Sequence, residues 1–155
     1  PLTGVCNRKL YESTMASSEG RDMGLIIVDI DDFKKFNDKY GHAVGDLVLK
    51  RVARSLQRAF RSEDLVCRIG GDEFVIILKG AVSLQAGKML KKAKKNMARL
   101  GEDKSLPPWE QISCAMGLCH YDPARHKKVV DVFNEADACM YQDKKKMRAE
   151  REDAR

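Results

Sequence analysis

The sequence has no long hydrophobic run, and its first residues do not have a signal-peptide pattern. None of its apolar stretches approaches the roughly 20 residues that a membrane-spanning helix needs. The N-terminus lacks a basic segment followed by an apolar one, which is the layout of a signal peptide. We therefore expect a cytoplasmic domain that makes no membrane contact of its own. Because the sequence begins at Pro1 rather than at a methionine, we also expect a piece of a longer protein.

Cysteine is present without a disulfide or zinc pattern. The cysteines are odd in number and include no C-x-x-C pair, so neither a disulfide framework nor a zinc knuckle is expected. They are Cys6, Cys67, Cys114, Cys119 and Cys139. We interpret them as small core residues in a reducing, cytosolic compartment.

Aromatic residues are few, at 6% of the sequence. Lys and Arg number 29 against 23 Asp and Glu, which gives a formal charge of +6 and is compatible with an anionic ligand. A basic nucleic-acid-binding domain is a rival interpretation. However, aromatic residues are not interleaved with the basic ones and no common nucleic-acid module is matched, so we expect no nucleic-acid partner.

The residues that are present predict one domain of alternating strands and helices. A chain of 155 residues with 43% hydrophobic content can bury a core without metals or disulfides. Apolar runs predict strands at 25–28, 65–69, 74–78 and 112–121, and helical spacing predicts helices at 10–15, 33–40, 46–60, 84–97 and 132–140. These elements predict an α/β sandwich, in which helices pack on a central sheet.

Acidic residues occupy two exceptional places in this pattern. Asp29 ends the first predicted strand, and Asp72 and Glu73 lie in the turn of the predicted hairpin. If the strands are neighbours, three carboxylates converge at one sheet edge, an arrangement that holds Mg²⁺ against a nucleoside triphosphate. The alternative is that turns simply favour Asp and that strand ends are often polar.

The turn spells GGDEF at residues 70–74, and further motifs accompany it in a fixed order. They are Leu2-Thr3-Gly4, Asn7-Arg8, Asp29-Ile30-Asp31-Asp32-Phe33-Lys34, Asn37-Asp38, Tyr40-Gly41-His42 and Gly45-Asp46. From residue 1 to about 148 the chain resembles the GGDEF domain of diguanylate cyclases, with a charged tail at 149–155. The resemblance implies an α+β fold with a mainly antiparallel sheet, like the nucleotidyl cyclases and polymerase palms.

The resemblance also implies the metal and catalytic residues. Asp29 and Glu73 would bind Mg²⁺ (or Mn²⁺) through carboxylates and Ile30 through its carbonyl, because hard oxygen ligands suit that ion. Asp72 would approach the metal and the ribose 3′-hydroxyl. Asp29, Asp72 and Glu73 are thus the implied catalytic residues.

The implied substrate site extends into the neighbouring segments. The phosphates would meet the backbone amides of Asp32 and Phe33, where a helix start favours anions, together with Lys34, Lys144 and Arg148. The alternative for the last two is an ordinary solvated basic tail. The base would be read by Asn37 and Asp46, since a carboxylate accepts from guanine N1–H and the 2-amino group. Asp46 could instead, or in addition, cap a helix that follows Gly45. The remaining residues of the implied substrate site are His42, Gly70 and Gly71.

A second site is implied by Arg61 and Asp64, which match the family's inhibitory cyclic di-GMP motif. The alternative is a modest surface ion pair. The chain also departs from the family pattern at Asp143, Met147 and Ala149. These departures predict that the last helix ends or bends differently, which puts the position of Arg148 in doubt.

The function implied by the resemblance is condensation of two GTP molecules into cyclic di-GMP. Each domain would hold one GTP, so catalysis requires a homodimer, and an upstream sensor domain would control the encounter. The product would inhibit the enzyme. The alternatives are an inactive GGDEF domain that binds GTP or cyclic di-GMP, and an adenylyl or mixed-nucleotide cyclase.

Overall fold

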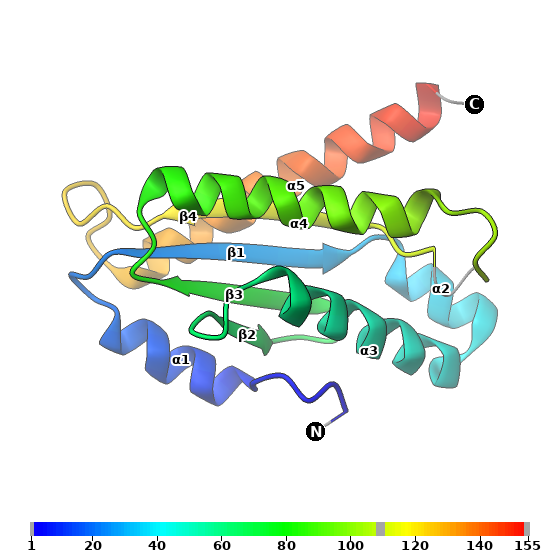
Figure 1. Cartoon of the computed structure of the whole chain (residues 1–155), viewed down its shortest axis with the longest axis horizontal. Helices are drawn as coiled ribbons and strands as arrows, with labels where there is room; N and C mark the ends of the chain where they lie inside the picture. The colour runs from blue at the N-terminus through cyan, green and yellow to red at the C-terminus, as the bar shows by residue number, and fades with distance from the viewer. Residues whose placement is uncertain (1, 108–110, 154–155) are drawn as a thin grey trace.

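The computed structural model describes residues 2–107 and 111–153. Helices and strands follow one another along the chain (Figure 1). They are α1 (Arg8–Ser17), β1 (Met23–Ile30), α2 (Phe33–Tyr40), α3 (His42–Ala59), β2 (Leu65–Arg68), β3 (Glu73–Lys79), α4 (Ser83–Glu102), β4 (Cys114–His120) and α5 (Val129–Asp153). None of these helices is long and apolar enough to cross a membrane.

The strands form a single sheet in the order β2-β3-β1-β4, and every neighbouring pair is antiparallel. This confirms the expected α+β class with an antiparallel sheet. The N-terminal segment lies beside β2 through a parallel bridge between Cys6 and Cys67. Because β1 is central, its end is flanked by both β3 and β4.

Helices cover both faces of the sheet (Figure 1). Successive side chains of a strand point to opposite faces, so Ile26 and Val28 join the core beneath α2, α3 and α4. Leu25 and Ile27 join the core beneath α1 and α5. This two-sided burial explains why the central strand reads as an unbroken apolar run.

The observed helices differ from the expected ones in two places. α3 begins at His42, directly after Gly41, whose φ of 89° ends α2. Asp46 therefore lies inside the helix, and the interpretation of Asp46 as a helix cap is wrong. Gly45 concealed this start, because a glycine inside a helix looks like a break in the sequence. In the structure Gly45 is buried against Asn37, and a Cβ at this position would lie 1.8 Å from Asn37 Oδ1.

The last helix does not end at the departures from the family pattern. α5 runs from Val129 to Asp153, so the expectation that the helix ends at these residues is wrong. Met147 is half-buried and packs against the core beneath α1 and α5, which gives it a structural role. Residues 149–153 continue the helix, whereas the rest of the expected tail lies outside the described residues.

Candidate active site

Three carboxylates, those of Asp29, Asp72 and Glu73, meet where the neighbouring strands β1 and β3 come to one end of the sheet, and we call this place the acidic edge. Asp29 on β1 lies directly opposite Glu73 on β3 in the antiparallel register. The adjoining turn is fastened to β1 by a hydrogen bond from Ile30 N–H to the Asp72 carbonyl oxygen at 3.2 Å. The antiparallel pairing of strands distant in sequence thus produces the convergence expected of Asp29, Asp72 and Glu73.

Burial and neighbouring negative charge raise the pKa of Asp72 and of Glu73. The pKa of Asp72 is raised by burial and by the interacting Asp29 carboxyl. The pKa of Glu73 is raised by burial and by the charges of Asp137, Asp29 and Asp72. Crowded negative charge of this kind is relieved by a cation, and carboxylate oxygens are the ligands that Mg²⁺ prefers. The residues present therefore fit a divalent metal ion.

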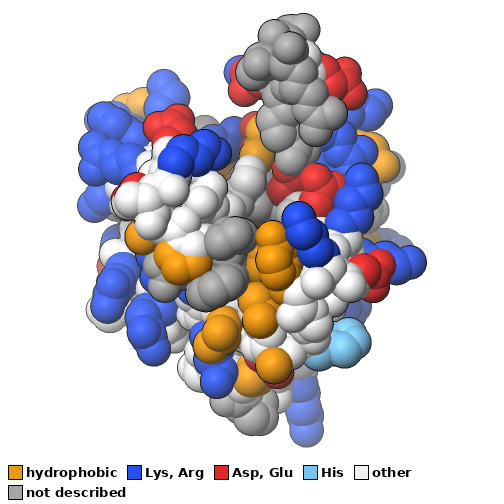
Figure 2. Space-filling model, turned by 90° about the vertical axis from the view of Figure 1, so that its right-hand side faces the viewer, with side chains coloured by type: hydrophobic (Ala, Val, Ile, Leu, Met, Phe, Trp, Pro, Cys, Tyr) orange, Lys and Arg blue, Asp and Glu red, His pale blue; other side chains and the backbone are white. Residues whose placement is uncertain are grey.

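Lys144 brings a positive charge to the same edge. Its Nζ donates to Asp29 Oδ2 at 2.8 Å, and the two side chains are 20% and 14% exposed. The hydrogen bond to Asp29 raises the pKa of Lys144, while the positive charge of nearby Arg148 opposes this effect. Figure 2 looks onto this end of the molecule, where acidic side chains adjoin Lys and Arg above a hydrophobic strip.

Two arginines shape the turn that carries Asp72 and Glu73. Arg68 donates through Nη2 to the Gly71 carbonyl oxygen at 2.9 Å and through Nε to that of Gly70 at 3.2 Å. Arg8 Nη1 donates to the Ile69 carbonyl oxygen at 3.2 Å. The sequence analysis included Arg8 only as part of the motif pattern, because backbone contacts of this kind leave no sequence signal.

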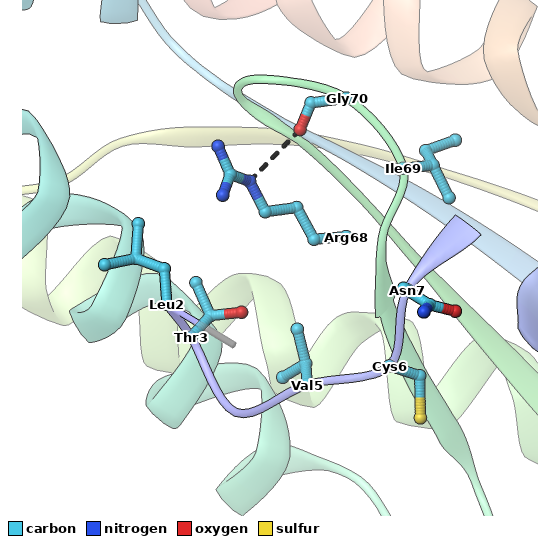
Figure 3. A pocket seen from close by; sticks show the side chains of 8 residues that line it. All are labelled: Leu2, Thr3, Val5, Cys6, Asn7, Arg68, Ile69 and Gly70. Atoms are coloured by element: carbon cyan, nitrogen blue, oxygen red, sulfur yellow. Dashed lines mark hydrogen bonds between the residues drawn. The ribbon is translucent and has the colours of Figure 1, made fainter. Parts of the chain in front are cut away.

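A hollow of about 540 Å³ adjoins this turn (Figure 3). Arg68, Ile69 and Gly70 form one side, and the N-terminal segment with Leu2 and Thr3 forms another. Its volume falls within the range of roughly 300–1,000 Å³ that is usual for small-molecule sites.

The segment after β1 places the expected phosphate-binding residues at the start of α2. Asp32 precedes the helix with a φ of 54°, in the left-handed region, which Asp tolerates better than most residues. Phe33 is buried and Lys34 is exposed. Strain in the backbone beside a cluster of acidic residues is typical of functional sites.

The expected base-reading residues lie on α2 and α3. Asn37 is half-buried, and no described residue donates a hydrogen bond to its buried Oδ1. His42 and Asp46 are exposed on the first turns of α3. The contact between Gly45 and Asn37 brings these two helices together at the expected base site.

Arg61 and Asp64 are not part of this edge. The Arg61 guanidinium donates to Asp64 Oδ1 at 2.7 Å and to the Lys79 carbonyl oxygen at 3.2 Å. Lys79 pairs with Met23 at the opposite end of β1 from Asp29. Six residues at about 3.3 Å each separate the two ends by about 20 Å.

A second group of possible metal ligands lies on β4, α5 and the loop between them. Cys119, His126 and Glu135 offer ligand atoms within 4.8 Å of one another. However, His126 Nδ1 accepts from Asp122 N–H at 3.0 Å, so its Nε2 carries the ring proton and donates toward Glu135. Glu135 is also paired with Arg125. These contacts make the group a hydrogen-bonded network rather than a prepared metal site.

The chain is similar in sequence to proteins of known activity. The family described as "Diguanylate cyclase, GGDEF domain" matches residues 1–150. Among curated proteins, diguanylate cyclase DgcP of Pseudomonas aeruginosa is 34% identical over 94% of this chain and 22% of its own length. Diguanylate cyclase DgcS of Shewanella oneidensis is 32% identical over 92% of this chain and 48% of its own. The chain thus spans half or less of the length of these relatives.

Solved structures of GGDEF domains have the same fold as this chain. The GGDEF domain of DgcB from Caulobacter crescentus, in complex with cyclic di-GMP, superposes with a TM-score of 0.80 at 27% identity, covering 94% of this chain and 86% of that one. The FimX GGDEF domain from Pseudomonas aeruginosa has a TM-score of 0.82 over 94% of this chain and 93% of its own, and at 21% identity it supports the fold alone.

Proposed function

Because this chain belongs to the GGDEF domain family of diguanylate cyclases, we propose that it condenses two GTP molecules into cyclic di-GMP. The ribose 3′-hydroxyl of each GTP attacks the α-phosphorus of the other. Two phosphodiester bonds form and two pyrophosphates leave. The observation that carries the proposal is the meeting of Asp29, Asp72 and Glu73 at one sheet edge with Lys144 among them.

In this proposal the acidic edge holds Mg²⁺ or Mn²⁺ through Asp29, Asp72, Glu73 and the Ile30 carbonyl. Such an ion, when bound, would neutralise phosphate charge and polarise the reacting phosphoryl group. Asp72 would also lie at the ribose 3′-hydroxyl. The raised pKa values of Asp72 and Glu73 support the metal-binding role of these residues, because crowded carboxylates favour a bound cation.

The chain's other charged groups would position the triphosphate. The backbone amides of Asp32 and Phe33, with Lys34, Lys144 and Arg148, would bind phosphate oxygens. Phosphoryl transfer depends mainly on such positioning and electrostatic stabilisation. The 2.8 Å contact between Lys144 and Asp29 supports Lys144 as the cation that lies nearest to the metal ligands.

Guanine would be read by Asn37 and Asp46, with His42, Gly70 and Gly71 completing the substrate site. A buried Oδ1 of Asn37 without a donor among the described residues supports this assignment, because buried acceptors are normally satisfied. Asp46 favours GTP over ATP, since adenine lacks the matching donors. A competition assay with both nucleotides tests this preference.

The direct test incubates the purified domain with GTP and Mg²⁺ and measures cyclic di-GMP by mass spectrometry. Glu73→Gln is expected to lower the rate at least about 100-fold, because it removes a carboxylate at the charge centre. Glu19→Gln, in an exposed loop, is the matched control. Product formation that survives Glu73→Gln would contradict the assigned chemistry. GTP binding without any product would identify an inactive binding module.

We further propose that cyclic di-GMP inhibits the domain by binding at Arg61 and Asp64. The buried Asp64 carboxylate holds Arg61 in a fixed orientation, which supports a prepared site. Arg61→Ala is expected to raise the half-inhibitory cyclic di-GMP concentration at least about tenfold relative to that of wild type. Arg58→Ala, an exposed arginine on the preceding turn of α3, is the control.

A further inference from the structure

Asp143 on α5 joins three elements through one carboxylate. Its Oδ2 accepts from Met116 N–H on β4 at 2.9 Å. Its Oδ1 accepts from Lys94 Nζ on α4 at 3.2 Å. Only 16% of the Asp143 side chain is exposed. The carboxylate therefore links the helices that cover opposite faces of the sheet across the open edge of β4.

The bond to Met116 is possible because β4 is an edge strand. Outward-facing N–H groups of an edge strand have no partner in the sheet, and Asp143 supplies one for Met116. α5 also lies very close to this strand, since a Cβ at Gly117 would lie 2.1 Å from the Met140 backbone nitrogen. Asp143 thus fastens a part of α5 that already contacts β4.

We infer that Asp143 is a positioning residue for Lys144 and, through it, for the triphosphate. The two residues are neighbours on α5, and each contacts a neighbouring position of the sheet. Asp143 binds the Met116 amide, whereas Lys144 binds Asp29, the register partner of Ala115. Successive helical residues point about 100° apart, so fixing the direction of Asp143 also fixes that of Lys144.

The two partners of Asp143 have separable effects. The Met116 amide sets the position of α5 along β4, because a backbone group cannot move without the strand. The Lys94 ammonium is on a flexible side chain that is 40% exposed, so its contribution is screened by solvent. We therefore assign the positioning mainly to the backbone hydrogen bond.

The first test does not depend on activity. The accessibility of Lys144 is measured as its rate of labelling by an amine-reactive ester, followed by mass spectrometry, with exposed Lys145 as the internal reference. Asp143→Ala is expected to raise the Lys144 rate about fivefold, because the hydrogen bond that orients α5 is lost. Asp143→Asn keeps an acceptor for Met116 and is expected to stay near the wild-type rate. Equal Lys144 rates in Asp143→Ala and wild type would overturn the inference.

The second test rests on the proposed cyclase function and uses a double-mutant cycle. Asp143→Ala is expected to lower kcat/KM for GTP about fivefold in the wild-type background but to have no effect in Lys144→Ala. Equal losses in both backgrounds would show that Asp143 acts only through general stability. Lys145→Ala, an exposed position on α5, is the control for removal of a lysine from that helix.

The two readouts distinguish the two possible failures. If wild type makes no cyclic di-GMP, the proposed function has failed and the labelling result still decides the role of Asp143. If Asp143→Ala does not fold, as judged by its thermal melting, Asp143→Ser replaces it with the same expected result, because serine is too short to reach the amide. If labelling does not change, the positioning role has failed even where the enzyme is active.

Discussion

At the residue scale, the site depends on charges that come together from distant parts of the sequence. Asp29 and Lys144 are 115 positions apart and yet form a 2.8 Å contact. Each compensates for the other's burial, because a partly buried charge without a partner is costly. The same pair would place a cation where phosphate oxygens meet the metal ligands.

Neighbouring lysines on α5 allow this contact to be tested. Lys144→Ala is expected to lower kcat/KM for GTP about 10- to 100-fold, the loss associated with one charge-assisted hydrogen bond. Lys145 is exposed and lies 5.7 Å from the centre of the Tyr141 ring. Lys145→Ala should stay within about twofold of wild type. Steady-state kinetics of both variants test the role of Lys144, and similar losses of kcat/KM in the two variants would contradict it.

Some of these residues were predictable and others were not. Asp29, Asp72 and Glu73 could be singled out because strand ends and tight turns are visible in a sequence. Asp143 was noticed only as a departure from the family pattern and Asp137 not as a site residue, because their contacts come from how α5 packs on the sheet. Asp137 adds negative charge beside Glu73, and Asp143 accepts from Met116.

At the element scale, the packing of α5 on β4 determines where the basic pair lies. The two elements approach closely at Gly117, where a Cβ would lie 2.1 Å from the Met140 backbone nitrogen and 2.4 Å from the Ala136 carbonyl oxygen. These are backbone atoms of α5, and they cannot move aside as the end of a flexible side chain can. This requirement for glycine ties the position of the helix to a single residue of the strand.

Replacing Gly117 should therefore strongly destabilise the folded domain. Gly117→Ala is expected to destabilise the domain by about 3 kcal/mol and to lower Tm by roughly 6–12 °C. At Gly87 on α4, an added methyl group would have no other atom within 4 Å. Gly87→Ala should instead stabilise by about 0.5–1 kcal/mol, as alanine does in helices. Thermal melting of both variants provides the comparison, and a neutral Gly117→Ala would show that the helix can move away.

The network at the other end of β4 predicts a dependence of stability on pH. Arg125, Cys119 and His126 lower the pKa of Glu135 from 4.5 to about 2. Because the folded pKa is depressed, this stabilisation is present above about pH 4.5 and is lost as the pH falls toward 2.

The Glu135 carboxylate is partly exposed, so solvent screening limits its contribution to about 1 kcal/mol. Glu135→Gln should lower the denaturation midpoint at neutral pH and converge with wild type near pH 2, below the unfolded pKa. Urea titrations at several pH values measure this convergence. A constant difference between the two proteins would show that Glu135 acts by packing and not by charge.

The elements themselves were largely predictable from the sequence. All four strands coincide with predicted apolar runs, because β-branched residues bounded by glycine and acidic residues give a strong signal. The start of α3 was missed because Gly45 inside the helix resembled a break. The unbroken course of α5 was missed because its stability at 143–147 comes from contacts with β4, α4 and the core.

At the scale of the whole molecule, the described residues form one acidic edge, which we propose holds one GTP. Cyclic di-GMP contains two guanylates, so the proposed reaction needs two domains that face each other. Specific activity is therefore expected to rise with enzyme concentration while the domain is mostly monomeric. Rates measured over a wide dilution series provide the test, and a constant specific activity would contradict the requirement for a dimer.

The two ends of β3 serve different proposed sites, with Lys79 beside Arg61 and Glu73 beside Asp29. Residues 74–78 between them are fully buried in the close-packed core, so we expect this strand to be rigid. We expect the product to act by restraining how two domains approach each other and not by deforming the distant carboxylates. The affinity of an isolated domain for GTP should then be unchanged by cyclic di-GMP, and a weakened affinity would reveal a signal carried along the strand.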